Sequence, residues 1–231
     1  MSVLTIENVQ KKFKDGDSEI VALEETSFTA EKGEFIAIIG PSGSGKSTFL
    51  SIAAGLQEPT QGRVMINDKP FSEKKEKERA RIRFDEVGFI LQASNLIPFL
   101  KVSDQLKLVD KLSKKEKSQL DLLELLGIEK LKNKFPEQIS GGEKQRVAIA
   151  RALYNNPSII FADEPTASLD SKRAMDVVDV LAKMTKQQNK TTIMVTHDLR
   201  LIDQCDKVYE MNDGVLTLRE NTDTTKGVQI V

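Results

Sequence analysis

The chain has 231 residues, a formal net charge of −1 at neutral pH and one cysteine, Cys205. This length allows one large domain or a core with an inserted lobe, and the near-neutral charge argues against a nucleic-acid partner. A lone cysteine excludes an intrachain disulfide and a cysteine-cluster metal site. Because we find no bilayer-length apolar stretch and no signal-peptide pattern, the composition predicts a soluble cytoplasmic protein.

Short strand-like runs alternate with helical patterns, which predicts an α/β fold with a largely parallel central sheet. In the N-terminal part of the chain we expect strands at Leu4–Val9, Ile20–Ala30 and Phe35–Ile39, with a turn at residues 16–18. The later predicted strands are Gly62–Ile66, Glu86–Leu91, Ser158–Ala162, Thr191–Thr196, Lys207–Met211 and Val215–Leu218. The runs at 158–162 and 191–196 are apolar or β-branched throughout, which is typical of strands buried on both faces.

The residues GPSGSGKS at positions 40–47 follow a buried strand and precede a helical pattern at Thr48–Leu56. This context supports a phosphate-binding loop, in which backbone amides point at phosphate oxygens. Lys46 supplies a charge for the outer phosphates, and the Ser47 hydroxyl suits a Mg²⁺ ligand. We therefore expect a nucleoside triphosphate to contact Gly40, Pro41, Ser42, Gly43, Ser44, Gly45, Lys46, Ser47 and Thr48.

Two acids end the predicted strand at Ser158–Ala162. Asp163, at the strand end, is placed to orient Mg²⁺ and its waters beside the phosphate loop. Glu164 is placed to polarise a water for in-line attack on the γ-phosphate. An ordinary solvated turn is the alternative, and the phosphate loop in the same chain disfavours it.

Ile139-Ser140-Gly141-Gly142-Glu143 precedes another helical pattern, and a Ser-Gly-Gly turn at a helix N-terminus is a second anion site. One nucleotide does not need two such cradles in one chain. The simplest interpretation is that Ser140, Gly141 and Gly142 grip the γ-phosphate of an ATP held by another subunit. This predicts a head-to-tail dimer with two ATP molecules between the chains.

Two further polar residues follow predicted strands. His197 is the only histidine and comes directly after Thr191–Thr196, on the ligand side of an open α/β sheet. We expect it to donate to the γ-phosphate or to hold the attacking water, along with the catalytic residues Glu164 and Lys46. Gln92 follows Glu86–Leu91 and is expected to sense the metal or the γ-phosphate.

Helical patterns replace the strand-like runs between Gln92 and Asn155, which predicts an inserted helical lobe. Its Leu-rich helix, Lys114–Leu126, is expected to start at a capping box formed by Ser113 and Glu116. Elsewhere, Ala174, Val177, Val178 and Leu181 recur at helical spacing. The charged run at 72–83 indicates a solvated helix face, with an RNA-binding patch as the weaker interpretation.

Together these motifs resemble the nucleotide-binding subunit of ABC transporters over about residues 1–218. In this resemblance the motifs are the Walker A loop Gly40–Ser47, the Q-loop residue Gln92, the signature Ile139–Glu143, the Walker B strand Ile159–Asp163 with Glu164, the D-loop Ser168–Asp170 and the switch histidine His197. The resemblance implies one ABC ATPase domain spanning 1–231. It would be a P-loop NTPase with a RecA-like core at about 1–92 and 157–218, an antiparallel β subdomain, a helical lobe at about 93–156 and a polar tail at 219–231.

The same resemblance implies ATP and Mg²⁺ as cofactors, with Ser47, Gln92 and Asp163 around the metal. It places Phe13 on the adenine ring, with an ordinary core phenylalanine as the alternative, and Asp170 at the nucleotide. Ile139 and Glu143 depart from the commonest Leu-Ser-Gly-Gly-Gln signature, and Glu143 is expected to alter the contact with the second subunit.

Within the family, residues 140–146 and 162–170 look like the macrolide-exporter and lipoprotein-release group. The segment Gly88–Val102 looks most like the ATPases of haem-regulated exporters of Gram-positive bacteria. This implies a homodimer on the cytoplasmic face of the membrane, in contact with the membrane only through a separate permease. The implied activity is ATP-driven export of haem or another amphipathic, toxic compound.

Other functions remain open. A regulatory ABC ATPase would act on cell-wall or cell-division partners without transport. A soluble ABC ATPase of DNA repair or translation would usually carry long insertions, and a small-molecule kinase would not need Ser140–Gly142. The apolar residues Leu96, Ile97, Phe99 and Leu100 either receive a permease helix or pack inside the helical lobe.

Overall fold

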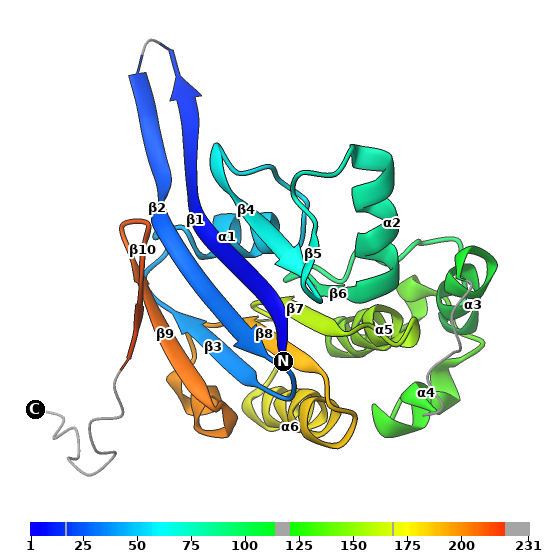
Figure 1. The fold of residues 1–231 in the computed structure, drawn as a ribbon. Helices are drawn as coiled ribbons and strands as arrows, with labels where there is room; N and C mark the ends of the chain where they lie inside the picture. The colour runs from blue at the N-terminus through cyan, green and yellow to red at the C-terminus, as the bar shows by residue number, and fades with distance from the viewer. Residues whose placement is uncertain (17, 114–120, 168, 220–231) are drawn as a thin grey trace, which may run out of the picture.

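The computed structural model describes residues 1–16, 18–113, 121–167 and 169–219. Within these ranges, one sheet has four antiparallel strands in the order β2-β1-β4-β5. Their bounds are β1 Ser2–Asp15, β2 Ser18–Glu31, β4 Gln61–Ile66 and β5 Lys69–Pro70. The β1–β2 pair is much longer than its neighbours, so its distal half projects from the body as an arm (Figure 1).

The second sheet of the described chain has six strands in the order β10-β9-β3-β8-β7-β6. Their bounds are β3 Phe35–Ile39, β6 Val87–Ile90, β7 Ile159–Asp163, β8 Thr191–Val195, β9 Lys207–Asn212 and β10 Val215–Leu218. Strand β10 is antiparallel to β9, and the other neighbouring strands run parallel. Every residue of β3 and β8 is buried, as the continuous apolar and β-branched runs predict.

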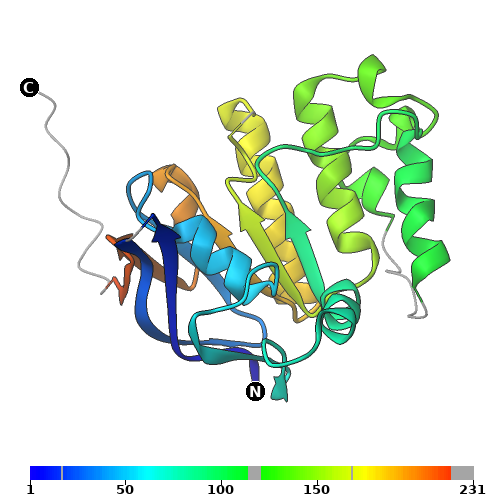
Figure 2. The same ribbon diagram turned by 90° about the horizontal axis from the view of Figure 1, so that it is seen from above.

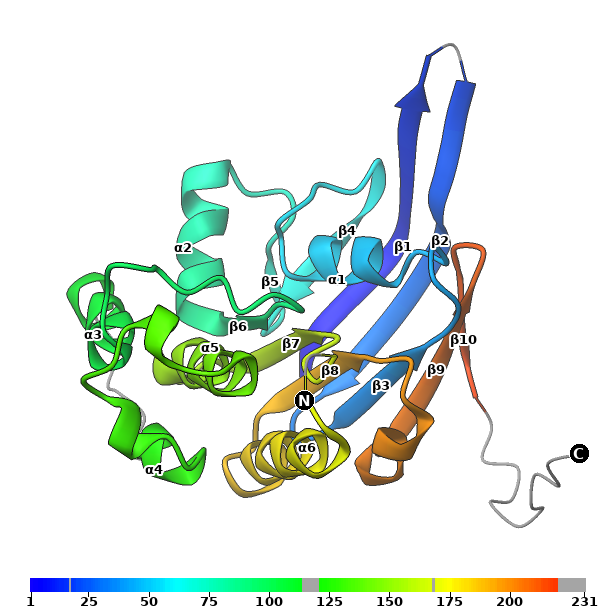
Figure 3. The same ribbon diagram turned by 180° about the vertical axis from the view of Figure 1, so that it is seen from behind.

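The helices are α1 Lys46–Ala53, α2 Glu76–Glu86, α3 Val102–Leu112, α4 Leu122–Leu125, α5 Gly141–Tyr154 and α6 Ser171–Gln187. The described part of the chain also has 3₁₀ turns at η1 Glu129–Leu131, η2 Pro136–Gln138 and η3 Leu199–Gln204. Helix α1 lies between the two sheets, where Phe49 packs in one core with Phe28 of β2 and Phe161 of β7 (Figure 3). Helices α3, α4 and α5 gather beyond the β6 edge of the parallel sheet (Figure 2).

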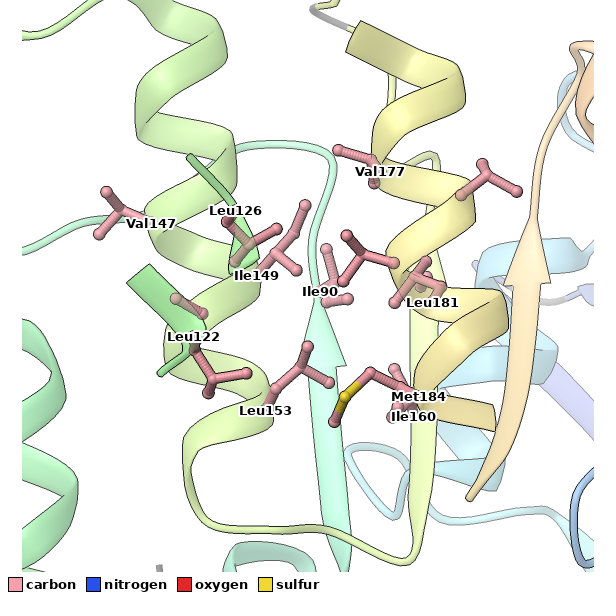
Figure 4. Close-up of a cluster of buried hydrophobic side chains, with 14 of the residues drawn as sticks. Ile90, Leu122, Leu126, Val147, Ile149, Leu153, Ile160, Val177, Leu181 and Met184 are labelled. Atoms are coloured by element: carbon pink, nitrogen blue, oxygen red, sulfur yellow. The ribbon is translucent and has the colours of Figure 1, made fainter. Parts of the chain in front are cut away.

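A second core lies on the other face of the parallel sheet. Leu153 of α5 and Leu181 of α6 point toward Ile90 of β6 and Ile160 of β7 from opposite sides (Figure 4). These four side chains are at most 1 % exposed. Helix α5 is thus packed on this face of the sheet against β6 and β7, the last two strands at one side of the sheet.

The predicted strands are all present, although β1 extends well beyond Leu4–Val9. The predicted charged helix at 72–83 begins later, as α2, and α3 is a helix that the sequence analysis did not define. The expected capping box at Ser113 involves Glu116, which lies outside the described residues, as do Asp17 and the tail from residue 220. None of the described helices has the length and apolarity that a bilayer crossing requires.

Candidate active site

The phosphate loop connects β3, which ends at Ile39, to α1, which begins at Lys46. Gly40 has φ of 146° and Gly45 has φ of 105°, conformations that residues with a side chain rarely adopt. A Cβ atom would lie 2.1 Å from the Met211 carbonyl oxygen at Gly40 and 2.5 Å from the Ala22 carbonyl oxygen at Gly45. Glycine is therefore required at both ends of the loop by backbone strands packed behind it.

Lys46 is almost completely buried, at 8 % exposure. Its ammonium group donates to the carbonyl oxygens of Gly40 at 2.9 Å and Pro41 at 2.6 Å, and lies 3.5 Å from Ser44 Oγ. The Lys46 ammonium therefore lies inside the loop, hydrogen-bonded only to uncharged oxygen atoms. Phosphate oxygens carry more negative charge than these carbonyls, so they are stronger acceptors for the same ammonium.

Asp163 is the last residue of β7 and lies beside the first turn of α1. The Ser47 hydroxyl donates to Asp163 Oδ1 at 3.3 Å. Burial raises the pKa of the Asp163 carboxyl, and the hydrogen bond from Ser47 partly offsets this effect. A hydroxyl and a carboxylate oxygen are hard ligands of the kind that Mg²⁺ prefers, and the amide of Gln92 lines the same cleft. The donor set therefore fits the metal that the sequence predicts.

Glu164 and His197 come together because β7 and β8 are adjacent parallel strands, with Asp163 paired to Val195. His197 Nδ1 lies 2.9 Å from Glu164 Oε2, with side-chain exposures of 72 % and 16 % respectively. Glu164 has φ of 48°, a left-handed conformation that is uncommon for a residue with a side chain. This strained backbone holds the carboxylate at the mouth of the cleft.

These groups line one cleft of about 430 Å³, a volume within the usual range of small-molecule sites. Its lining comprises Ala22, Gly40, Ser42, Gly43, Gly45, Lys46, Ser47, Thr48, Gln92, Asp163, Glu164, Val195 and His197. Ala22 and Val195 are additions that the sequence analysis did not identify, because their strands reach the cleft only through sheet pairing and packing.

The second predicted anion cradle is at the N-terminus of α5 and does not line this cleft. The Glu143 carboxylate accepts from the Ser140 N–H at 2.8 Å and from the Ser140 hydroxyl at 2.9 Å. The Glu143 N–H donates in return to Ser140 Oγ at 3.3 Å. These hydrogen bonds from Ser140 lower the pKa of the Glu143 carboxyl. An acidic side chain thus occupies both donors of Ser140, one of the three residues that the sequence assigns to a phosphate.

Four other predicted contact residues lie outside the cleft lining: Pro41 and Ser44 of the phosphate loop, Phe13 and Asp170. Phe13 is 39 % exposed on the β1–β2 arm, opposite Ile20, and the Lys11 ammonium lies 5.0 Å from its ring centroid. This exposure does not fit a core phenylalanine. Asp170 caps α6 by accepting from the Arg173 N–H at 3.0 Å. Its predicted D-loop neighbour Ser168 lies outside the described residues.

A buried parallel sheet with a phosphate loop between its strand β3 and helix α1 defines a P-loop class of nucleotide-binding protein. The family model described as "ABC transporter" matches residues 23–167. The chain is 46 % identical over 219 residues to the "putative hemin import ATP-binding protein HrtA" of Staphylococcus aureus strain Newman, covering 93 % of this chain and 99 % of that protein. The corresponding protein of strain MRSA252 is 45 % identical over the same coverage.

Solved structures similar to this chain are ATP-binding cassettes of the same family. The cassette MJ0796, in a dimeric post-hydrolysis state bound to ADP and phosphate, superposes with a TM-score of 0.86 at 36 % identity, covering 95 % of this chain and all of that one. The protein cbiO1 of Clostridium perfringens, part of the transporter complex cbiONQ, has a TM-score of 0.81 at 30 % identity, with 94 % and 87 % coverage. The chain belongs to the ABC transporter family, as an ATP-binding subunit. It is an ATPase with the P-loop NTPase fold that the sequence predicts.

Proposed function

We propose that this subunit hydrolyses Mg²⁺-bound ATP in a head-to-tail dimer and thereby drives a separate permease that exports haem. The observation that carries the proposal is the separation of two anion sites, the cleft at Lys46 and the cradle at Ser140, in one chain. A dimeric arrangement in which each cradle closes the other chain's cleft gives both sites a use.

In this mechanism different residues of the cleft bind the phosphates, bind the metal and accept the proton. The Lys46 ammonium moves from its loop carbonyls to the outer phosphate oxygens, and Ser47, Asp163 and Gln92 hold the metal, which supplies charge neutralisation when bound. Glu164 accepts a proton from the attacking water as the bond to the γ-phosphorus forms and the β–γ bridge breaks. His197 holds that carboxylate in place and faces the γ-phosphate.

The remaining contacts of the site belong to the same proposal. The loop Gly40–Thr48 cradles the phosphates, and Ser140, Gly141, Gly142 and Glu143 meet the partner's γ-phosphate, with Asp170 beside that interface. Phe13 stacks on the adenine ring, as its exposure on the arm above the loop permits. Residues 93–156 act as the helical lobe and 1–92 with 157–218 as the core.

Haem is proposed because the name of the Staphylococcus aureus relatives includes hemin and because segment 88–102 resembles that of haem-regulated exporters. The permease anchors the subunit at the cytoplasmic face of the membrane. The name of those relatives describes import, whereas export is proposed here on the resemblance of segment 88–102.

The test uses the subunit co-purified with its permease and reconstituted in vesicles. Haem is expected to stimulate phosphate release, and ATP supplied on the side of the subunit is expected to move haem to the opposite side. The Glu164→Gln complex is the matched control and should transport nothing. Phosphate release that is stimulated by other amphipathic compounds but not by haem would show that haem is not the substrate. Movement of haem toward the side of the subunit would show import instead of export.

A further inference from the structure

The β1–β2 arm carries the Phe13 ring without an apolar core around it (Figure 1). Strand β1 pairs with β4 only as far as Gln10, so beyond that residue β2 is its one partner among the described strands. Phe13 lies opposite Ile20, which is itself 52 % exposed, and it belongs to neither of the two apolar cores of the described chain. Apolar packing therefore does little to fix how this ring is turned.

A lysine side chain covers one face of the ring. Lys11 and Phe13 are two residues apart on β1, so their side chains emerge on the same face of the strand. The Lys11 ammonium lies 5.0 Å from the ring centroid, a distance at which the negative face of an aromatic ring attracts a cation. Because the ammonium covers one face, the exposed 39 % of Phe13 is left for the other face and the edges.

The Lys11 ammonium is itself held by the segment that follows α1. Lys11 Nζ donates to the Glu58 carbonyl oxygen at 2.8 Å. Glu58 Oε1 lies 2.8 Å from Arg79 Nη2, so the Glu58 carboxylate pairs with a different cation. The same segment is tied to the base of the arm, because the Thr60 N–H donates to the Gln10 carbonyl oxygen at 2.8 Å. A backbone oxygen thus sets where the ammonium lies relative to the ring.

A ring held in this way is suited to stacking on a planar base. Aromatic side chains stack on nucleobases through their faces, and a ring that is oriented beforehand loses less conformational freedom when a base binds. An ammonium on the far face draws electron density from the ring, which favours contact with the face of an electron-rich purine. A cation–π contact at an exposed site changes an equilibrium constant by a factor of about two to five.

We infer that Lys11 is a positioning residue for the nucleobase. Its ammonium, held by the Glu58 carbonyl, supports one face of the Phe13 ring and leaves the other face for adenine. The phosphates bind separately, at the loop before α1, so Lys11 contributes to the binding of the base alone. This inference rests on the proposed stacking of Phe13 on the adenine ring.

The test separates the base from the phosphates by comparing MgADP with magnesium pyrophosphate, which has no base. By calorimetry on the whole chain, Lys11→Met should weaken MgADP binding about two- to fivefold and leave pyrophosphate binding unchanged. The chain has no tryptophan, so Phe13→Trp places a single fluorescent indole at the stacking position. MgADP is expected to quench this indole, pyrophosphate is not, and adding Lys11→Met should reduce the quenching.

Two matched variants show whether the charge over the ring is what acts. Arginine keeps the charge and stacks on aromatic faces, so Lys11→Arg should restore the MgADP affinity. The ammonium of the neighbouring Lys12 lies 3.4 Å from Glu19 Oε2. Lys12→Met therefore removes the same charge from the arm without uncovering the ring, and both affinities should stay at their wild-type values.

Three outcomes would overturn the inference. They are unchanged MgADP binding in Lys11→Met, tighter MgADP binding because the ammonium covers the face that the base needs, and an equal loss of MgADP and pyrophosphate binding because Lys11 acts on α1 through Glu58. The stacking itself is tested apart from Lys11. A Phe13→Ala chain that binds MgADP as tightly as the wild type would refute the proposed use of Phe13.

Discussion

His197 Nδ1 lies 2.9 Å from Glu164 Oε2, and the carboxylate is the more buried of the two groups. The histidine therefore reaches from the solvent side to a carboxylate whose backbone is already fixed by β7 and by a left-handed φ of 48°. The backbone of Glu164 fixes where the carboxylate lies, and the contact with the imidazole of His197 fixes how the carboxylate is turned relative to the cleft.

Replacing Glu164 with glutamine should reduce steady-state phosphate release by about 10²–10⁴-fold, because the amide cannot accept the proton of the attacking water. ATP affinity should persist, since Lys46 and the loop are unchanged. His197→Ala should also slow hydrolysis and leave ATP affinity near the wild-type value. Both are measured on the transporter complex. Wild-type turnover in Glu164→Gln would remove this residue from the chemistry.

Replacing Asp163 with asparagine should stabilise the nucleotide-free chain while abolishing Mg²⁺-dependent hydrolysis. Burial raises the pKa of this carboxyl, so the folded state holds the proton more tightly than the unfolded state. The free energy of unfolding therefore falls as pH rises from the ordinary pKa through the raised value, and the deficit persists at neutral pH. Asparagine removes the charge and still accepts from Ser47.

The expected gain is about 1 kcal/mol at pH 7, measured by denaturant unfolding. It should shrink toward zero below about pH 4, where the wild-type carboxyl is also protonated in both states. Asp104→Asn, on the surface of α3, is the control and should give no such gain. A destabilised Asp163→Asn at pH 7 would show that burial of this charge is fully compensated in the wild type.

Replacing Glu143 with glutamine should strengthen ATP-driven dimerisation. In the free chain the carboxylate holds the Ser140 N–H and hydroxyl, so a phosphate from the partner must compete with it and meets its negative charge. Glutamine keeps an acceptor for the helix cap but removes the charge. We expect a several-fold lower concentration for half-maximal dimer formation in the Glu164→Gln background, measured by light scattering.

Ser140→Arg is the opposing variant, because its larger side chain and charge block the cradle. It should prevent the dimer and leave ATP binding in the cleft intact. Glu137→Gln, in the turn before the cradle, is the charge-matched control. Equal dimerisation by Glu143→Gln, Ser140→Arg and the parent would show that the cradle does not meet a phosphate of a second chain.

The sequence predicts the phosphate loop, the ends of β7 and β8 and hence most of the cleft, because each is a local pattern beside a buried strand. It underestimates β1, since the residues from Gln10 to Asp15 lie on an arm without a buried face and show no alternation. It misses α3 because Gln105, which is fully buried, looks like a surface residue until its carbonyl partners are known. Ala22 joins the cleft only through tertiary packing, which spacing along the chain does not reveal.

The apolar residues after Gln92 separate into two groups. Leu96 packs against the lobe core, whereas Phe99 is 77 % exposed. Core packing is therefore wrong for Phe99, and a permease helix remains the predicted use of its side chain. The loop carbonyls on either side of Phe99 are held by Gln105, so the ring is presented on a fixed backbone.

Phe99→Ala should weaken binding of the permease by about 2 kcal/mol or more, as expected for an aromatic anchor at an interface centre. The free energy of unfolding and the ATP affinity of the isolated chain should change little, because an exposed ring makes few internal contacts. Leu56→Ala, an exposed leucine that follows α1, is the matched control and should keep permease binding. Thermal stability, ATP affinity and permease pull-down are measured together on the three chains. Unchanged pull-down with unchanged export would remove Phe99 from the coupling surface, and a large stability loss would show that its ring is covered within the folded chain.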